Sequence, residues 1–138
     1  MELSDMIAYV RGIGSGVVAT TAAHGAPQAA YLDLTATDGG ELVFNARSDS
    51  RKVANIVRDG RVAVVIGGAD GTTLQCEGTA VIADGPQLER CATAYAAAFP
   101  HVEPVRPGVV LVVVTLSWAR HRDYRGAPVS RDVDLAVG

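Results

Sequence analysis

Two adjacent cations, Arg51 and Lys52, stand where a helix ordinarily disfavours positive charge. The three residues before them, 48–50, are Ser-Asp-Ser, and each can cap the N-terminus of a short helix that runs to about residue 58. A helix N-terminus carries partial positive charge and unpaired N–H groups, so a cation in its first turn costs about 0.3–1 kcal/mol unless an anion binds there. The pattern therefore indicates a phosphomonoester site. The alternative is an ordinary solvated helix start that Asp49 neutralises.

A second set of chemistry-bearing side chains lies near the end of the chain. Trp118, Arg120 and Arg122 share one face of an expected strand because strand side chains alternate, and His121 belongs to the other face. The two guanidinium groups are candidates for receiving an anionic substrate, with the indole ring beside them. The alternative is a frayed strand end on which Trp118 covers the core.

Other common kinds of site are not predicted. Cys76 and Cys91 have no Cys or His at metal-ligand spacing, so we expect two buried thiols and no metal centre. The sequence has no nucleophile elbow, Walker loop or zinc signature. A net charge of −3 argues against binding to nucleic acid or to an anionic membrane. No apolar run is long enough to cross a bilayer and no signal peptide is evident, so we expect a cytoplasmic protein.

The elements that must position these residues fit one domain over 1–138. A helix at about 4–11 and a glycine-rich linker make up residues 1–15, and a polar tail makes up 125–138. Helices are also expected at 51–58 and 86–99. Turn signals and apolar patterns predict six strands, at 17–22, 28–37, 41–46, 61–66, 72–83 and 109–122. Antiparallel strands with short helices between them predict a closed or nearly closed barrel of mostly β, α+β class.

The last expected strand is apolar on both faces. Residues 109–116 read Val-Val-Leu-Val-Val-Val-Thr-Leu without alternation, so both faces must be covered. One face fills the barrel, and the other needs a helix or a second subunit. In a chain this short, we expect the second subunit.

The order of these elements and motifs resembles the pyridoxamine 5′-phosphate oxidase-like, FMN-binding split-barrel family. The resemblance covers about residues 5–124. It is carried by the hairpin at 16–30, by Leu-Val-Phe-Asn-Ala-Arg-Ser-Asp-Ser-Arg-Lys-Val-Ala-Asn at 42–55, by Arg-Val-Ala-Val-Val-Ile at 61–66 and by Glu-Gly-Thr-Ala at 77–80. It implies a six-stranded antiparallel split β-barrel.

The resemblance also implies where the cofactor phosphate binds. In the family, a Ser-Arg-Lys sequence holds the phosphate of FMN, and the matching residues here are Ser50, Arg51 and Lys52. This coincides with the phosphomonoester site that the helix start indicates.

The flavin ring and the ribityl chain are implied to contact other strands. In the family, the strand before the helix contacts the flavin, and the matching residues here are Asn45 and Ala46. A later strand of the family directs a polar group toward the ring, and the matching residue here is Gln75. Thr73 is the alternative to Gln75 because the sequence does not fix the strand register across the preceding turn. Trp118 is expected to shape the open face of the flavin.

Family members are homodimers with flavin at the subunit interface, which agrees with the doubly apolar last strand. The expected function is an FMN-dependent oxidoreductase for a small molecule, with the flavin reduced by that substrate or by a nicotinamide nucleotide. Two alternatives stay open: a reductase of the same fold that uses the deazaflavin F420, and a non-catalytic flavin-binding or electron-carrying protein. Haem-like ligands, which replace flavin in some relatives, also stay open.

Two departures from the family argue against pyridoxamine phosphate as the substrate. The second strand has no cation at 31–35 to bind a substrate phosphate, and the late segment 118–124 lacks the Arg-x-His spacing of the true oxidases. Arg120, His121 and Arg122 are the remaining candidates for contacting a substrate.

Overall fold

The computed structural model describes residues 1–136 as three helices and eight strands. The helices are α1 (Leu3–Ile13), α2 (Arg51–Arg58) and α3 (Gly85–Ala98). The strands are β1 (Ser15–Thr21), β2 (Pro27–Asp33), β3 (Thr35–Ala36), β4 (Leu42–Arg47), β5 (Arg61–Gly67), β6 (Thr72–Ile82), β7 (Val109–Asp123) and β8 (Val129–Asp132). None of the three helices is long and apolar enough to span a membrane.

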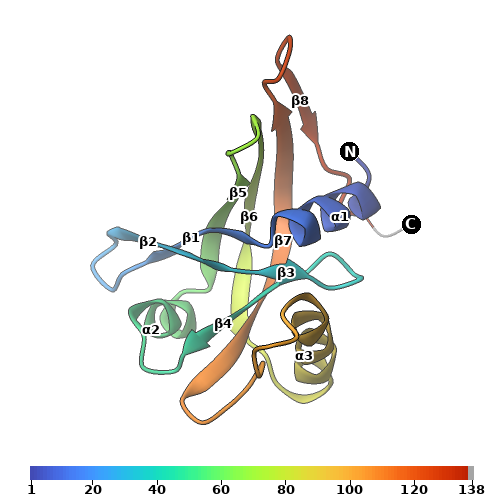
Figure 1. The fold of residues 1–138 in the computed structure, drawn as a ribbon. Coiled ribbons are helices and arrows are strands. Elements are labelled where there is room, and N and C mark those ends of the chain that lie inside the picture. Colours follow the sequence, from blue (N-terminus) through green and yellow to red (C-terminus); the bar gives the residue numbers. More distant parts are fainter. Residues whose placement is uncertain (137–138) are drawn as a thin grey trace.

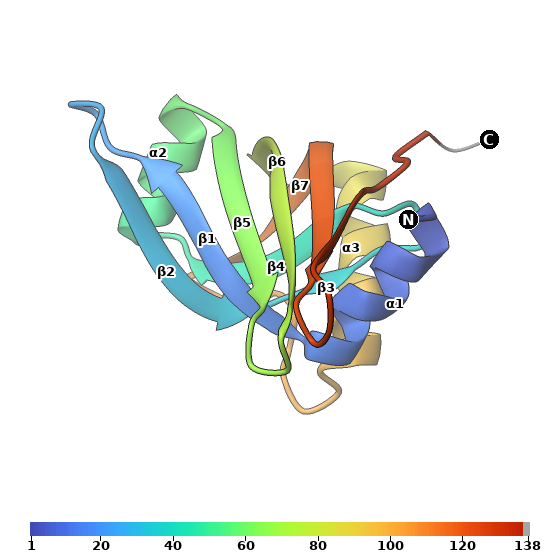
Figure 2. The ribbon, with the colours of Figure 1, turned by 90° about the horizontal axis from the view of Figure 1, so that it is seen from above.

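The strands form one antiparallel sheet in the order β2-β1-β5-β6-β7-β4-β3, with β8 paired to β7. This sheet curls into a half-barrel, as Figures 1 and 2 show. The predicted split-barrel class is therefore confirmed. β2 and β3 lie at opposite ends of the strand order although only Leu34 separates them along the chain. The Leu34 N–H donates to the Gly14 carbonyl oxygen (3.1 Å) where the chain passes between the two edges.

The prediction of six strands was wrong, for two reasons. The expected strand 28–37 is divided, because β2 pairs with β1 whereas β3 pairs with β4. The segment 125–138, expected as a polar tail, contains β8, whose Asp132 accepts a hydrogen bond from Arg120 of β7 (2.6 Å). Both pairings are short hairpins that lack the usual sequence signal, since the division at Leu34 falls within one continuous strand-like stretch and β8 is exposed at all its positions, without the alternation typical of a half-buried strand.

α1 and the inner face of the sheet make the main core. Met6 and Val10 of α1 pack in one cluster with Phe44, Leu74 and Val112, all fully buried. The helix begins at Leu3, close to the expected start at about residue 4, with Glu2 at the N-cap and no capping side chain. It ends at Gly14, whose φ of 73° is the left-handed conformation that favours glycine.

α3 covers the second face of β7. Cys91 and Tyr95 of α3 pack in a buried cluster with Val43, Leu111 and Val113. The doubly apolar strand is thus covered on both faces within one chain, so the pattern at 109–116 does not by itself require a second subunit. Burial raises the pKa of the Cys91 thiol, as expected for a packing residue.

Candidate functional site

The start of α2 has the geometry that its sequence predicts. Ser50 is the N-cap, and its hydroxyl oxygen accepts from the backbone N–H of Val53 (3.4 Å). Arg51 and Lys52 follow in the first turn, which holds no acidic residue. Asp49 does not neutralise them, because its carboxylate accepts two hydrogen bonds from Arg47, both 3.1 Å long. Among the described residues, the helix start therefore has two cations and no carboxylate against them.

A polar network anchors this helix start to the β1–β2 hairpin. The Gln28 side-chain oxygen accepts from Arg51 Nε (3.2 Å) and from Asn55 Nδ2 (2.8 Å). Asn55 is buried, and its Nδ2 also donates to the Thr20 hydroxyl (2.9 Å). The other end of its amide, Oδ1, accepts from Arg58 (3.2 Å). Buried polar groups satisfied in this way fix the geometry of their neighbours, so Asn55 and Gln28 position the Arg51 guanidinium.

Sequence reasoning missed Gln28, Thr20 and Asn55 as site residues. One signal was present for Asn55, which lies four residues after Arg51 and so on the same face of the helix. Gln28 carried no comparable signal, since its contact with Arg51 joins residues 23 apart and exists only in the folded chain.

A cavity of about 350 Å³ lies beside the network. Its walls are the strand residues Val18, Thr20, Pro27, Gln28, Ala29 and Ala30, and Arg51 and Lys52 border it. Small-molecule sites span about 300–1,000 Å³, so this cavity is at the small end of that range. It combines an apolar wall with adjacent cations, which suits a phosphate and the chain attached to it.

Asn45 and Ala46 lie on β4, immediately before the loop that leads into α2. Ala46 is buried in the interior, whereas Asn45 is half-buried on the opposite face and pairs in register with Leu111 of β7. Both are near the start of α2 along the chain, as the resemblance implies.

A separate group gathers on the outer face of β6 and β7. Gln75 pairs in register with Arg120, and Thr73 pairs with Arg122. Gln75 is exposed and Thr73 half-buried, so both of the alternatives left open belong to this face. The Arg120 guanidinium lies over the Trp118 ring at 5.1 Å from its centroid, a cation–π contact.

Two of the late arginines, Arg120 and Arg125, differ from Arg51 and Lys52 because they pair with carboxylates. Arg120 pairs with Asp132 (2.6 Å), and this contact lowers the pKa of the Asp132 carboxyl. Arg125 pairs with Asp123 (2.8 Å) and lowers the pKa of that carboxyl to about 2. Arg122 donates to the Tyr124 hydroxyl (3.3 Å).

His121 is on the inner face, away from the arginines that flank it in sequence. Its ring meets Tyr9 of α1 edge-on, with 5.0 Å between the centroids. The Tyr9 hydroxyl is hydrogen-bonded to Thr72 (3.0 Å), and burial raises the pKa of Tyr9. His121 thus packs α1 onto the sheet and is separated from the candidate substrate face.

One chain does not bring all the predicted cofactor residues together. Asn45 pairs with Leu111 and Gln75 pairs with Arg120, positions nine residues apart on β7. At about 3.3 Å per residue this is about 30 Å, longer than a flavin mononucleotide. In addition, Gln28 and Thr20 face the concave side of the sheet, whereas Gln75 faces outward. The predicted residues therefore form two groups, one around α2 and one on the outer face.

The sequence matches the family described as pyridoxamine 5′-phosphate oxidase over residues 5–123. The chain belongs to this family. The sequence has no significant match among curated proteins.

Solved structures with the same fold include proteins of several descriptions. A conserved hypothetical protein of Mycobacterium tuberculosis is 23% identical with a TM-score of 0.74, over 91% of this chain and 86% of that one. A pyridoxamine 5′-phosphate oxidase-related, FMN-binding protein of Nostoc punctiforme is 16% identical with a TM-score of 0.68, over 96% and 94%. A heme-binding protein of Mycobacterium smegmatis is 20% identical with a TM-score of 0.66, over 89% and 56%. At these identities the likeness establishes the fold alone.

Proposed function

We propose that this protein is an FMN-dependent oxidoreductase that acts on a small molecule other than pyridoxamine phosphate. The observation that carries the proposal is the start of α2, where Arg51 and Lys52 have no carboxylate partner and Gln28 holds Arg51 beside a cavity. A phosphate is the anion that this donor set fits, because cations, a capping hydroxyl and free N–H groups converge there. Family membership and the FMN-binding protein of the same fold support flavin as the group attached to that phosphate.

Bound FMN supplies the electron chemistry, so the protein's own residues need only bind and orient it. Arg51 and Lys52 neutralise the phosphate, and Gln28 and Asn55 hold the Arg51 guanidinium in place. Asn45 and Ala46 lie on opposite faces of β4 and do not line the cavity, so their proposed contact with the flavin rests on the family resemblance. A protein whose cofactor supplies the reactive group needs no catalytic triad, which agrees with the absence of a triad motif from the sequence.

We also propose a homodimer with flavin at the interface. The two groups of predicted residues lie too far apart for one ligand within one chain, so a second copy would supply the outer-face group, Thr73, Gln75 and Trp118. The outer face is suited to an interface, because Tyr31, Val17 and Val65 pair across β2, β1 and β5 and are 73%, 38% and 45% exposed. Exposed apolar rows of this kind mark association surfaces.

The substrate is proposed to lack a phosphate group. A second dianion beside FMN needs its own cations, and an unpaired one is costly to desolvate. Arg120 and Arg125 are already paired with carboxylates, which leaves Arg122 as a single cation on that face, and Asp33 at the end of β2 would repel a phosphate. A nicotinamide nucleotide is a candidate electron donor.

The absorption spectrum of the purified protein tests the cofactor. An oxidised-flavin spectrum supports FMN, whereas a deazaflavin spectrum would indicate F420 and a Soret band would indicate haem. Steady-state turnover of the FMN-loaded protein, with reduced nicotinamide nucleotide and a panel of electron acceptors, then tests the activity. Flavin binding without turnover across the panel would favour an electron-carrying protein. Oxidation of pyridoxamine phosphate at about 1 s⁻¹ or faster, the low end of typical turnover, would overturn the substrate proposal.

A further inference from the structure

Lys52 is the only lysine in the sequence, which has 12 arginines and lysines in total. Both kinds of side chain attract anions. Only the lysine amine can lose its proton and form a covalent bond to a ligand, because a guanidinium group stays protonated in proteins. The single lysine therefore adds a reactive group to the residue pair assigned to the cofactor phosphate at the start of α2.

No carboxylate holds the Lys52 amine. Six ion pairs occur among residues 1–136, and each of them uses an arginine. Lys52 is half-buried and borders the cavity of about 350 Å³ beside α2. Its amine is therefore available to a small molecule that enters this cavity.

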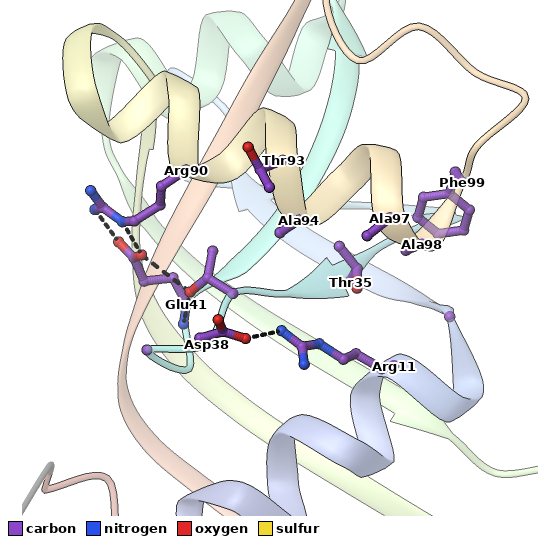
Figure 3. A pocket seen from close by; sticks show the side chains of 13 residues that line it. Arg11, Thr35, Asp38, Glu41, Arg90, Thr93, Ala94, Ala97, Ala98 and Phe99 are labelled. Carbon is purple, nitrogen blue, oxygen red and sulfur yellow. Dashed lines mark hydrogen bonds and ion pairs between the residues drawn. The ribbon is translucent and has the colours of Figure 1, made fainter.

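A larger cavity, about 830 Å³, lies between α1, β3 and α3 and shows the opposite arrangement (Figure 3). Its two cations are both arginines and both are paired, Arg90 with Glu41 (2.9 Å) and Arg11 with Asp38 (2.8 Å). Among residues 1–136, its walls hold no lysine and no cation without a carboxylate partner. Chemistry at an amine is therefore particular to the cavity beside α2.

Arg51 is suited to hold the phosphate of a molecule that reacts there. Its Nε donates to Gln28 (3.2 Å), which leaves both terminal amino groups without a partner among residues 1–136. The terminal amino groups of a guanidinium can bind two oxygens of one phosphate. Because Arg51 and Lys52 border the same cavity, a group attached to that phosphate can enter the space that the Lys52 amine borders.

We propose that Lys52 is acylated by small acyl phosphates, which the FMN-free protein binds through the site that FMN uses. This inference rests on the proposed phosphate site. The neutral Lys52 amine attacks the carbonyl carbon of the acyl phosphate. An N–C bond forms, the C–O bond to the phosphate breaks, inorganic phosphate leaves and the amine releases one proton. The products are an N-acyl lysine and inorganic phosphate.

Acylation regulates the uptake of the cofactor. An acylated lysine has no positive charge, so one charge-assisted contact to the FMN phosphate is lost. FMN affinity should therefore fall about 10- to 100-fold, whereas riboflavin affinity should change little. Bound FMN in turn occupies Lys52 and protects its amine. The site accepts either FMN or an acyl group, according to which arrives first.

Acetyl phosphate tests the proposal on the full, FMN-free chain that carries the substitution Arg131→Lys. Arg131 is an exposed residue of β8 outside the cavity and makes no ion pair, so the introduced lysine is an internal reference. Peptide mass spectrometry measures the acetylation rate of each lysine. We expect Lys52 to react at least about 10-fold faster than the reference, because binding orients the donor. A donor without phosphate, p-nitrophenyl acetate, should show no such preference. Equal rates with acetyl phosphate overturn the proposal.

Competition and one further variant test the role of the phosphate site. Inorganic phosphate and FMN should each slow acetylation of Lys52 and leave the reference lysine unchanged. Arg51→Gln should remove the preference of acetyl phosphate for Lys52. A preference that survives in this variant, or unchanged FMN affinity of the acetylated chain, overturns the proposal.

Titration of the unmodified chain with FMN separates this proposal from the proposed function. A chain that binds FMN but shows no preference for Lys52 overturns the acylation proposal alone. Selective acetylation of Lys52, slowed by inorganic phosphate, in a chain that does not bind FMN supports acylation and overturns the proposed function.

Discussion

Arg51 at the start of α2 and Arg120 on β7 differ in the group that holds each guanidinium. Arg51 is held by a neutral amide, Gln28, and no acidic residue lies in its helix turn. Arg120 is held by a carboxylate, Asp132, on the adjacent strand. A cation that a neutral group orients keeps its full attraction for an anion, whereas a paired cation must first lose its partner. The comparison supports the proposal that the first region binds a phosphate, whereas Arg120 joins two paired strands.

The substitution Gln28→Glu would make the first region resemble the second. A carboxylate would then face Arg51 at the present 3.2 Å contact, compete with the phosphate and repel it. Charge-assisted hydrogen bonds contribute about 1.5–3 kcal/mol, so we expect FMN affinity to fall about 10- to 100-fold. Fluorescence titration with FMN measures this loss, with riboflavin as the control ligand that should lose little. Unchanged FMN affinity would show that Arg51 does not contact the phosphate.

The substitution Asn55→Ala tests the buried hydrogen-bond network that positions Arg51 at the start of α2. It removes two donated hydrogen bonds and leaves the Thr20 hydroxyl buried without that donor. A buried group left unpaired costs about 1–3 kcal/mol, so the free energy of unfolding should fall by that amount in urea titration. Ala54→Ser, at an exposed position of the same helix, is the control and should change it much less. A loss no larger than that of the control would contradict the network.

The two regions should respond to different ranges of pH. The second pKa of a phosphomonoester is about 6, so FMN loses one negative charge as pH falls from 7 to 5 and should bind more weakly. Riboflavin affinity should not change over this range. The Asp123 pKa is lowered from 3.8 to about 2 by Arg125, so that pair contributes fully above about 3.8 and is lost only as pH falls through 2. FMN affinity that stays constant from pH 7 to 5 would argue against a phosphate dianion at α2.

The smallest effect is expected from Arg120→Ala. Its ion pair with Asp132 is partly exposed, and exposed pairs contribute little to stability. We expect the Tm to change by about 4 °C or less and FMN affinity to change by less than about twofold. Differential scanning calorimetry and the same FMN titration measure both quantities. A large loss of FMN affinity would place this arginine in the cofactor site and remove the contrast between the regions.

The parts of the molecule that local patterns determine were predictable. α2 and the position of Arg51 and Lys52 follow from a polar segment, a short amphipathic repeat and two adjacent cations, and the structure selects Ser50 among the three possible caps at 48–50. The shared face of Trp118 and Arg120 follows from strand alternation, and their register partners Glu77 and Gln75 are likewise alternate residues of β6.

The parts that have no distinctive local pattern were not predictable. Nothing near Leu34 signals that the chain leaves β1 there and pairs with β4, and β8 is exposed at every position, so it lacks the alternation that marks a half-buried strand. The covering of β7 by α3 was one of two alternatives, because an apolar strand face does not specify its partner. For the same reason, Gln28 became a site residue only once the hairpin had been placed against α2.

The most direct test of the central claim is phosphate discrimination, measured as the ratio of the Kd values for riboflavin and FMN. Isothermal titration of the intact protein and of the double variant Arg51→Ala/Lys52→Ala gives this ratio, with Arg120→Ala/Arg125→Ala as the matched control. Two charge-assisted contacts of about 1.5–3 kcal/mol each predict that the intact protein binds FMN at least about 100-fold tighter than riboflavin. The ratio should fall toward one in the α2 variant and stay unchanged in the control. Equal losses of FMN and riboflavin affinity in the α2 variant would contradict a phosphate site at Arg51 and Lys52.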